Sequence, residues 1–140
     1  MSLFRPQLWR IPTTGEAERR RLPELTATLE TRLKHIARRY PQAVFASSLA
    51  VEDMIITDAI CRLKLPLRII TLDTGKLNPE TAALITAVNV RYQTELEVFH
   101  PDPESARQFE QEFGATAMYD SVELRRRCCH IRKKIGRAHV

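Results

Sequence analysis

The stretch Ala43–Asp53 constrains the fold of this chain most strongly. A short apolar run, Ala43–Ala46, is typical of a strand that is buried on both faces of a sheet. A loop of small residues follows, and Val51–Leu63 then has a helical pattern with two acids in its first turn. Because the first N–H groups of a helix have no partner within it, a helix that begins directly after a strand can bind an anion. The alternative is an ordinary strand-to-helix turn capped by Ser48.

Patterns elsewhere predict strands that alternate with helices. We expect strands over Leu67–Leu72 and Thr94–Phe99, and helices over Glu16–Tyr40 (two pieces if Pro23 begins a new one), Pro79–Arg91, Pro103–Phe113 and onward from an Asp120 N-cap. This alternation is typical of βαβ units and a parallel sheet. Right-handed crossovers would bring the loops after Phe45 and Leu72 to one edge, the carboxyl end of the strands, where such folds bind ligands.

Composition limits the function classes. The chain has 140 residues, enough for one domain with its own core, and a formal net charge of +5, which suits a protein that handles an anionic small molecule. No apolar run approaches the roughly 20 residues that a membrane span requires, so we expect no membrane partner, and we see no secretory signal. The three cysteines, two of them adjacent, do not form a disulfide framework, so we expect a reducing cytoplasm.

Three motifs then occur in order: Ser47–Asp53, Leu72–Gly75 and Arg127–Lys133. Together they closely resemble the assimilatory sulfonucleotide reductases, the enzymes that reduce adenylyl sulfate or its 3′-phosphorylated form to sulfite. The resemblance runs from about Gln42 to Lys133. It includes the Pro-Glu-Thr at Pro79–Thr81 and a cysteine pair flanked by basic residues.

The resemblance implies an adenine-nucleotide α-hydrolase-like fold, a Rossmann-like α/β parallel sheet with flanking helices, truncated here. It also implies a substrate pocket lined by Ser47, Ser48, Glu52, Asp53, Leu72, Asp73, Thr74 and Gly75. The main chain of Leu72 would bond the base, and Gly75 would allow a close backbone approach. Alternatively, Asp73 caps the following turn, and Glu52 and Asp53 only complement the helix dipole. We assign no proton transfer to either acid, because the nucleotide phosphate is already a good leaving group.

The adjacent Cys128 and Cys129 are the sharpest chemical signal, because thiolates are the natural ligands of iron–sulfur clusters. In the family that the chain resembles, members with such a pair also have a downstream Cys-x-x-Cys, and the four thiolates hold a 4Fe-4S cluster. The resemblance gives Lys133 a catalytic role, as the residue that links cluster and substrate. Alternatively, the pair is two buried thiols within a solvated basic face. Cys61 lies in an apolar helical pattern and is expected in the core.

The chain departs from the family at its C-terminus. The downstream Cys-x-x-Cys, an arginine-bearing active-site loop and the tail with the nucleophilic cysteine have no counterpart in this sequence. Residues 135–140 resemble a translated sequencing adapter, and we expect a non-native tail there. We therefore divide the chain into an N-terminal arm and helix (1–41), an incomplete nucleotide-binding α/β domain (42–134) and this tail. We expect a fragment that has no turnover and no stoichiometric cluster of its own.

The resemblance implies a parent enzyme that reduces adenylyl sulfate in sulfate assimilation, on the way to cysteine. In the implied mechanism the missing cysteine attacks the sulfate sulfur, AMP leaves, and thioredoxin or glutaredoxin frees sulfite from the S-sulfocysteine. Phosphoadenylyl-sulfate reduction is the near alternative. An ATP pyrophosphatase would want a Ser-Gly-Gly-x-Asp-Ser loop, and Leu49–Val51 lacks those glycines. A third hypothesis is a protein that binds nucleic acid through the basic segment Arg125–Lys134. This hypothesis explains neither the Leu72–Gly75 motif nor the cysteine pair.

Overall fold

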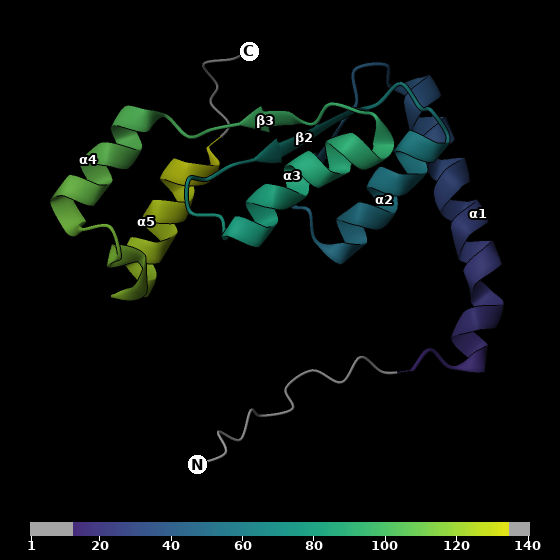
Figure 1. The fold of residues 1–140 in the computed structure, drawn as a ribbon, viewed down its shortest axis with the longest axis horizontal. Helices are drawn as coiled ribbons and strands as arrows, with labels where there is room; N and C mark the ends of the chain where they lie inside the picture. Colours follow the sequence, from purple (N-terminus) through teal and green to yellow (C-terminus); the bar gives the residue numbers. More distant parts are fainter. Residues whose placement is uncertain (1–12, 135–140) are drawn as a thin grey trace.

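The computed structural model describes residues 13–134, an α/β arrangement of helices around one small sheet (Figure 1). In chain order the elements are α1 (Glu16–Arg39), β1 (Val44–Ser47), α2 (Val51–Arg62), β2 (Arg68–Leu72), α3 (Pro79–Tyr92), β3 (Glu97–Phe99), α4 (Pro103–Phe113), the 3-10 turn η1 (Ala117–Tyr119) and α5 (Val122–Lys133). The predicted tail, residues 135–140, and the first twelve residues of the predicted arm lie outside the described residues. The division of the chain at residue 41 stays a prediction.

The sheet has the order β1-β2-β3, and both strand pairs are parallel. Ser47 is paired with Thr71, and Leu72 with Phe99, so the strands end at nearly the same level. The parallel α/β sheet with flanking helices that the sequence predicts is thereby confirmed. All the strands end on the side of the molecule where α4 and α5 lie (Figure 1).

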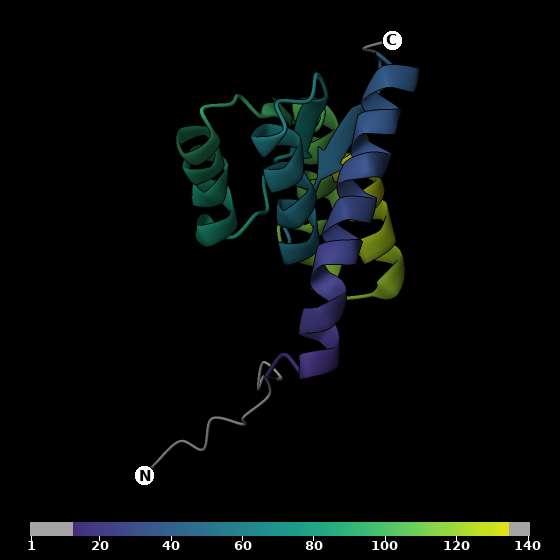
Figure 2. The same cartoon turned by 90° about the vertical axis from the view of Figure 1, so that its right-hand side faces the viewer.

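The main core lies between one face of the sheet and the helices. Its buried members come from both: Leu33, Leu49, Ala59, Ile60, Ile69, Val88 and Leu96. Figure 2 shows α2 and α3 on the same side of the sheet. The opposite face of β1 is open, since Val44 is 41% exposed and Ala46 is exposed. The expectation of a strand buried on both faces is therefore wrong for β1, where only alternate residues point into the core.

A second, smaller core stands at the carboxyl end of the strands. Phe109 of α4, Ala117 of η1 and Cys128 of α5 are its buried members. The rings of Phe109 and Phe113 lie 5.2 Å apart between centroids, which adds an aromatic contact to this cluster. This core holds α4 and α5 together beside the loops that leave β1 and β2.

Three local expectations differ from the structure. Pro23 does not split α1, which runs unbroken from Glu16 to Arg39. Proline has no N–H to bond the carbonyl four residues earlier, but this part of the helix is exposed, so that carbonyl can bond to water instead. The N-cap of α5 is Ser121, whose side chain accepts from Leu124 N–H at 3.1 Å, and not Asp120, which ends the 3-10 turn. The third strand is shorter than expected, because the N–H groups of Thr94 and Leu96 bond to Asn89 at the end of α3.

None of the helices within residues 13–134 combines the length and the apolar character that a membrane crossing requires.

Candidate functional site

The two loops singled out in the sequence leave neighbouring strands at the same edge. Ser47 ends β1 and is the register partner of Thr71, one residue before the end of β2. The loops 47–53 and 72–75 therefore begin side by side at the carboxyl edge of the sheet, as the topology predicts. Their role in binding stays a prediction.

The first loop is closed by Ser48 and Asp53. The N–H and the hydroxyl of Ser48 both donate to Oδ2 of Asp53, at 2.6 Å each. These two hydrogen bonds, the one from the hydroxyl first, lower the pKa of Asp53 because they favour its ionised form. Ser48 Oγ also accepts from Ala50 N–H at 3.4 Å, so Ser48 caps the turn as the alternative expects, whereas the N-cap of α2 is Ala50 and has no side-chain cap. An anion at this loop would have to share Ser48 with the Asp53 carboxylate.

Leu49 carries the strain of the first loop. Its φ of 64° is left-handed, which is costly for any residue but glycine, at about 1 kcal/mol. Its side chain is only 6% exposed within the main core, and its N–H donates to Ser47 Oγ at 3.1 Å. Burial of a leucine side chain contributes about 2 kcal/mol, enough to hold the turn without a glycine. Nothing in the local sequence signals this conformation.

The start of α2 offers backbone donors. The first intrahelical hydrogen bond joins Met54 N–H to the carbonyl of Ala50 at 2.9 Å. The N–H groups of Val51 and Glu52 precede it and point out of the helix end. Glu52 itself is exposed. An anion at this helix end could accept hydrogen bonds from these N–H groups.

The second loop is a turn shaped by its own side chains. Asp73 Oδ1 accepts from Gly75 N–H at 2.9 Å, and Thr74 Oγ1 accepts from Lys76 N–H at 3.3 Å. Asp73 N–H donates to the carbonyl of Phe99 at 2.9 Å and so extends the pairing with β3. Gly75 has a φ of 70°, which explains the glycine. The alternative that Asp73 caps this turn is therefore confirmed.

Arg132 of α5 reaches this second loop. Its side chain is 9% exposed; Nη1 donates to the carbonyl of Thr74 at 2.8 Å, and Nη2 to Glu110 Oε1 at 2.6 Å. Lys76 Nζ lies 2.9 Å from the same Glu110 oxygen. Hydrogen bonding by Lys76, with the positive charges of Lys76 and Arg132, lowers the pKa of Glu110. We call these three side chains the Arg132–Glu110–Lys76 network. No role for Glu110 or Lys76 could be predicted from the sequence, because these contacts join residues far apart in the chain.

Comparison with known proteins decides the family. Residues 42–137 match the model of the phosphoadenosine phosphosulfate reductase domain. The chain belongs to this family. The match includes both loops and all of α5.

Several curated relatives of this reductase-domain chain are adenosine 5′-phosphosulfate reductases. The one from Neisseria meningitidis serogroup A is 45% identical over 134 residues, which cover 95% of this chain and 55% of that protein. The one from Burkholderia cepacia is 46% identical over 114 residues, 79% of this chain and 46% of that protein. The one from Allochromatium vinosum is 43% identical over 122 residues, which cover 81% of this chain and 48% of that protein. The chain thus spans about half the length of these relatives.

The cysteines of this reductase domain lie in different surroundings. Cys128 is 4% exposed and packs against Phe109 and Ala117, whereas its neighbour Cys129 is exposed. Cys61 belongs to the main core on α2, where burial, and then the charge of Asp58, raises its pKa. Within residues 13–134 no three His, Cys, Asp or Glu side chains are grouped as a metal site. Two thiols on one helix, one buried and one exposed, do not fit a complete four-thiolate cluster site.

Lys133 is exposed at the last position of α5 in this reductase domain. Within the described part of the chain it makes no hydrogen bond or ion pair of its own. The side chain of its neighbour Arg132 is buried and bonded to the carbonyl of Thr74 in the second loop, so Arg132 is held more firmly than Lys133. The predicted catalytic role of Lys133 stays a prediction.

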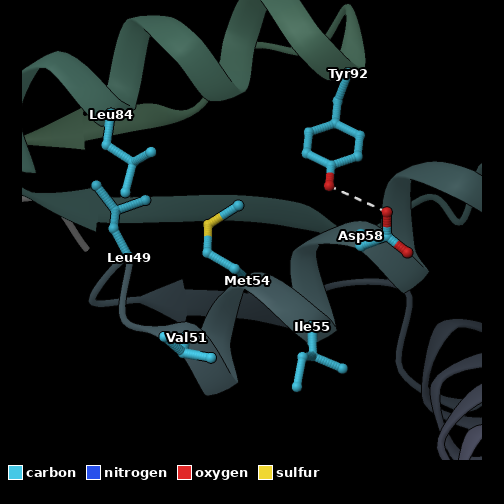
Figure 3. A pocket seen from close by; sticks show the side chains of 7 residues that line it. All are labelled: Leu49, Val51, Met54, Ile55, Asp58, Leu84 and Tyr92. Atoms are coloured by element: carbon cyan, nitrogen blue, oxygen red, sulfur yellow. Dashed lines mark hydrogen bonds between the residues drawn. The ribbon is translucent and has the colours of Figure 1, made fainter. Parts of the chain in front are cut away.

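The reductase domain also has an apolar pocket between α2 and α3 (Figure 3). It has a volume of about 520 Å³ and is lined by Leu49, Val51, Met54, Ile55, Asp58, Leu84 and Tyr92. The hydroxyl of Tyr92 donates to Asp58 Oδ1 at 3.0 Å and joins the two helices. None of the eight residues predicted to line the substrate pocket lines this one, and its polar wall is acidic, so it does not suit an anionic ligand.

Proposed function

We propose that this chain is the nucleotide-binding half of an enzyme that reduces adenylyl sulfate to sulfite and AMP. The observation that carries the proposal is the pair of loops at the carboxyl edge, the second of them tied to the cysteine-bearing helix by Arg132. The family membership supports sulfonucleotide reduction, and the relatives named as adenosine 5′-phosphosulfate reductases favour adenylyl sulfate.

In this proposal the two loops divide the nucleotide between them. The main chain at Leu72 bonds the adenine, and Gly75 lets the backbone approach it closely. The start of α2 receives the anionic part through the N–H groups of Val51 and Glu52. Ser47, Ser48 and Asp53 hold that loop in shape, and Thr74 and Asp73 do the same for the second loop.

The chemical step proceeds by thiolate attack. A cysteine thiolate from outside this chain attacks the sulfate sulfur, the S–O bond to the phosphate breaks, and AMP leaves with the electron pair. A dithiol such as reduced thioredoxin or glutaredoxin then attacks the S-sulfocysteine. Its first thiolate bonds to the cysteine sulfur, and sulfite leaves with the electron pair of the broken S–S bond. Its second thiolate then displaces the enzyme cysteine from this mixed disulfide, so the dithiol ends as a disulfide after giving up two electrons. Such chemistry requires a reducing compartment, and we assign it to the cytoplasm.

In the longer protein we propose that Cys128 and Cys129 supply two of four thiolates for a 4Fe-4S cluster, the other two coming from beyond this chain. Lys133 would lie between that centre and the substrate. No step above depends on the cluster, because the described residues do not complete its site.

Calorimetry of the 140-residue chain tests the nucleotide assignment. We expect weak AMP binding, and affinity for GMP lower by about tenfold, the cost of mismatched hydrogen bonds to the base. Equal binding of AMP and GMP would contradict the base contact. Adenosine 3′,5′-bisphosphate distinguishes the alternative: tighter binding than AMP would favour the 3′-phosphorylated substrate.

A further inference from the structure

Among the lysines and arginines that the structure describes, Arg132 stands apart by its burial. Its side chain is 9% exposed, whereas the side chain of Arg107 on α4 is 58% exposed and, among residues 13–134, pairs only with Glu104, three residues away on the same helix. A guanidinium taken out of water requires directed partners to offset its lost hydration. Arg132 has two such partners on two other elements, the Thr74 carbonyl and the Glu110 carboxylate. An arginine whose guanidinium stays in water would need neither of these partners.

The acceptor on the loop side is a main-chain carbonyl in the middle of the second loop. A Cβ at the next residue, Gly75, would lie 3.3 Å from Arg132 Nη1. The glycine therefore serves the turn and also admits the guanidinium. Lys76, directly after it, is held by Glu110 and by the carbonyl of Ala115, at 2.9 and 3.2 Å. Thr74 is thus bonded to α5, and Lys76 to α4 and to the loop after it.

The other end of the Arg132 side chain belongs to the cysteine-bearing helix. Arg132 follows Cys128 by one helical turn, and Cys128 packs against Phe109, the residue before Glu110. A movement of the loop therefore displaces Arg132, and with it the packing around Cys128. Coupling of this kind acts in both directions, because binding free energies are linked.

We propose that Arg132 is a positioning residue, one that fixes the Leu72–Gly75 loop for nucleotide and couples nucleotide binding to the order of α5 around Cys128. The binding part of this proposal rests on the proposed function. The positioning part does not, since the contacts exist without nucleotide.

The first test is calorimetry with AMP on three variants of the whole chain. Arg132→Gln removes the charge and one arm of the guanidinium, and should weaken AMP binding about tenfold. Arg132→Lys keeps the charge but reaches only one acceptor, and should restore part of the affinity. Arg107→Gln is the matched control, an equal charge change at an exposed site, and should leave the affinity unchanged. Equal affinities for Arg132→Gln and wild type would overturn the coupling.

The second test needs no nucleotide. Amide hydrogen exchange of residues 73–76 should be about tenfold faster in Arg132→Gln, with exchange in β1 unchanged. Unchanged exchange at the loop would overturn the positioning role. If wild type binds no AMP, the proposed function fails, while this measurement still decides whether Arg132 positions the loop.

The third test reads the coupling from the helix side. Bound AMP should slow the modification of Cys128 by a thiol reagent in wild type, and this protection should disappear in Arg132→Gln. Protection of equal size in both would contradict the coupling. Where Arg132→Gln does not fold, Glu110→Gln keeps Arg132 and weakens its anchor, and should show smaller changes in the same direction. Wild-type behaviour of Glu110→Gln in all three measurements would then overturn the proposal.

Discussion

The carboxylate of Asp53 binds both donors of Ser48, five residues earlier in the chain, at 2.6 Å each. This contact closes the loop that leads from β1 into α2. Because both donors favour the ionised form, the pKa of Asp53 lies below its ordinary value of 3.8. The loop is therefore held by a charge that acid removes.

Asp53→Asn should show a stability difference that depends on pH. A carboxyl group whose pKa is lower in the folded state stabilises the fold above its unfolded value, and that stabilisation is lost as pH falls through the folded value. We expect wild type to be more stable by about 1 kcal/mol at pH 7, with solvent screening included, and the difference to shrink as pH falls below 3.8. Urea unfolding across this range measures it. Glu52→Gln, the neighbouring exposed acid, is the control, and an equal pH dependence there would contradict the Ser48 contact.

Gly75→Ala and Gly114→Ala separate backbone strain from site geometry. Both glycines have positive φ, 70° and 95°, so each alanine should cost about 1 kcal/mol of stability. Only the Cβ at Gly75 meets Arg132, at 3.3 Å, whereas nothing lies within 4 Å of one at Gly114. We expect both variants to melt earlier and only Gly75→Ala to lose AMP affinity. A similar loss in Gly114→Ala would mean that strain alone explains the effect.

Thr57→Val should stabilise the chain. Thr57 is fully buried on α2, and among the described residues its Oγ1 has no hydrogen-bond partner. An unpaired buried hydroxyl costs about 1 kcal/mol or more, and valine has the same shape without it. We expect a higher melting temperature for Thr57→Val and a lower one for Thr57→Ala, which leaves a cavity. A destabilised valine variant would show that the hydroxyl has a partner, such as a buried water.

The thiols should react at different rates in the folded chain. Cys129 is exposed and should be labelled by a maleimide quickly, whereas Cys128 is buried and should react only as α5 opens. Cys61 should also be slow, because its raised pKa leaves little thiolate at neutral pH. Mass spectrometry over a time course gives the order. Removal of the fast phase by Cys128→Ser rather than Cys129→Ser would contradict the packing of α5.

Iron analysis of the chain purified without oxygen tests the cluster assignment. The two thiols of α5 provide half of the four ligands, so we expect no stoichiometric iron. A longer chain that supplies a downstream Cys-x-x-Cys should bind about four iron atoms, and Cys128→Ser or Cys129→Ser should remove them. An iron-loaded 140-residue chain would mean that the ligand count is wrong or that two chains share a cluster. If the longer chain binds no iron, Cys128 and Cys129 are not ligands of a cluster.

Features encoded by neighbouring residues could be predicted from the sequence. The helix over Pro79–Tyr92 ends within one residue of the expected position, because Asn78 caps its start and Pro79 fits its first turn. Gly114 ends α4 where expected, since its positive φ suits a helix end. The adjacency of the two loops followed from the alternation of strands and helices alone.

Features that depend on tertiary context could not be predicted. The leucines of α1 begin to pack against the core only at Leu29. Leu22 and Leu25 are half exposed because the first turns of the helix extend beyond the body of the molecule (Figure 1). The left-handed Leu49 is held by the core beneath it and not by its own preference. The contact of Arg132 with Thr74 spans 58 positions, so no local pattern distinguishes this arginine from its basic neighbours.

The contact between Arg132 and the Thr74 carbonyl has an evolutionary consequence. A main-chain acceptor is present whatever side chain position 74 carries, so mutation there leaves the bond intact. Selection for the contact would act on the donor and on the space beside it, the glycine at position 75. Descendants of a common ancestor could then exchange the residue at 74 without losing this contact, while they keep an arginine and a glycine that do not vary together with it. This contact is inherited through the path of the backbone, and covariation between side chains would not reveal it.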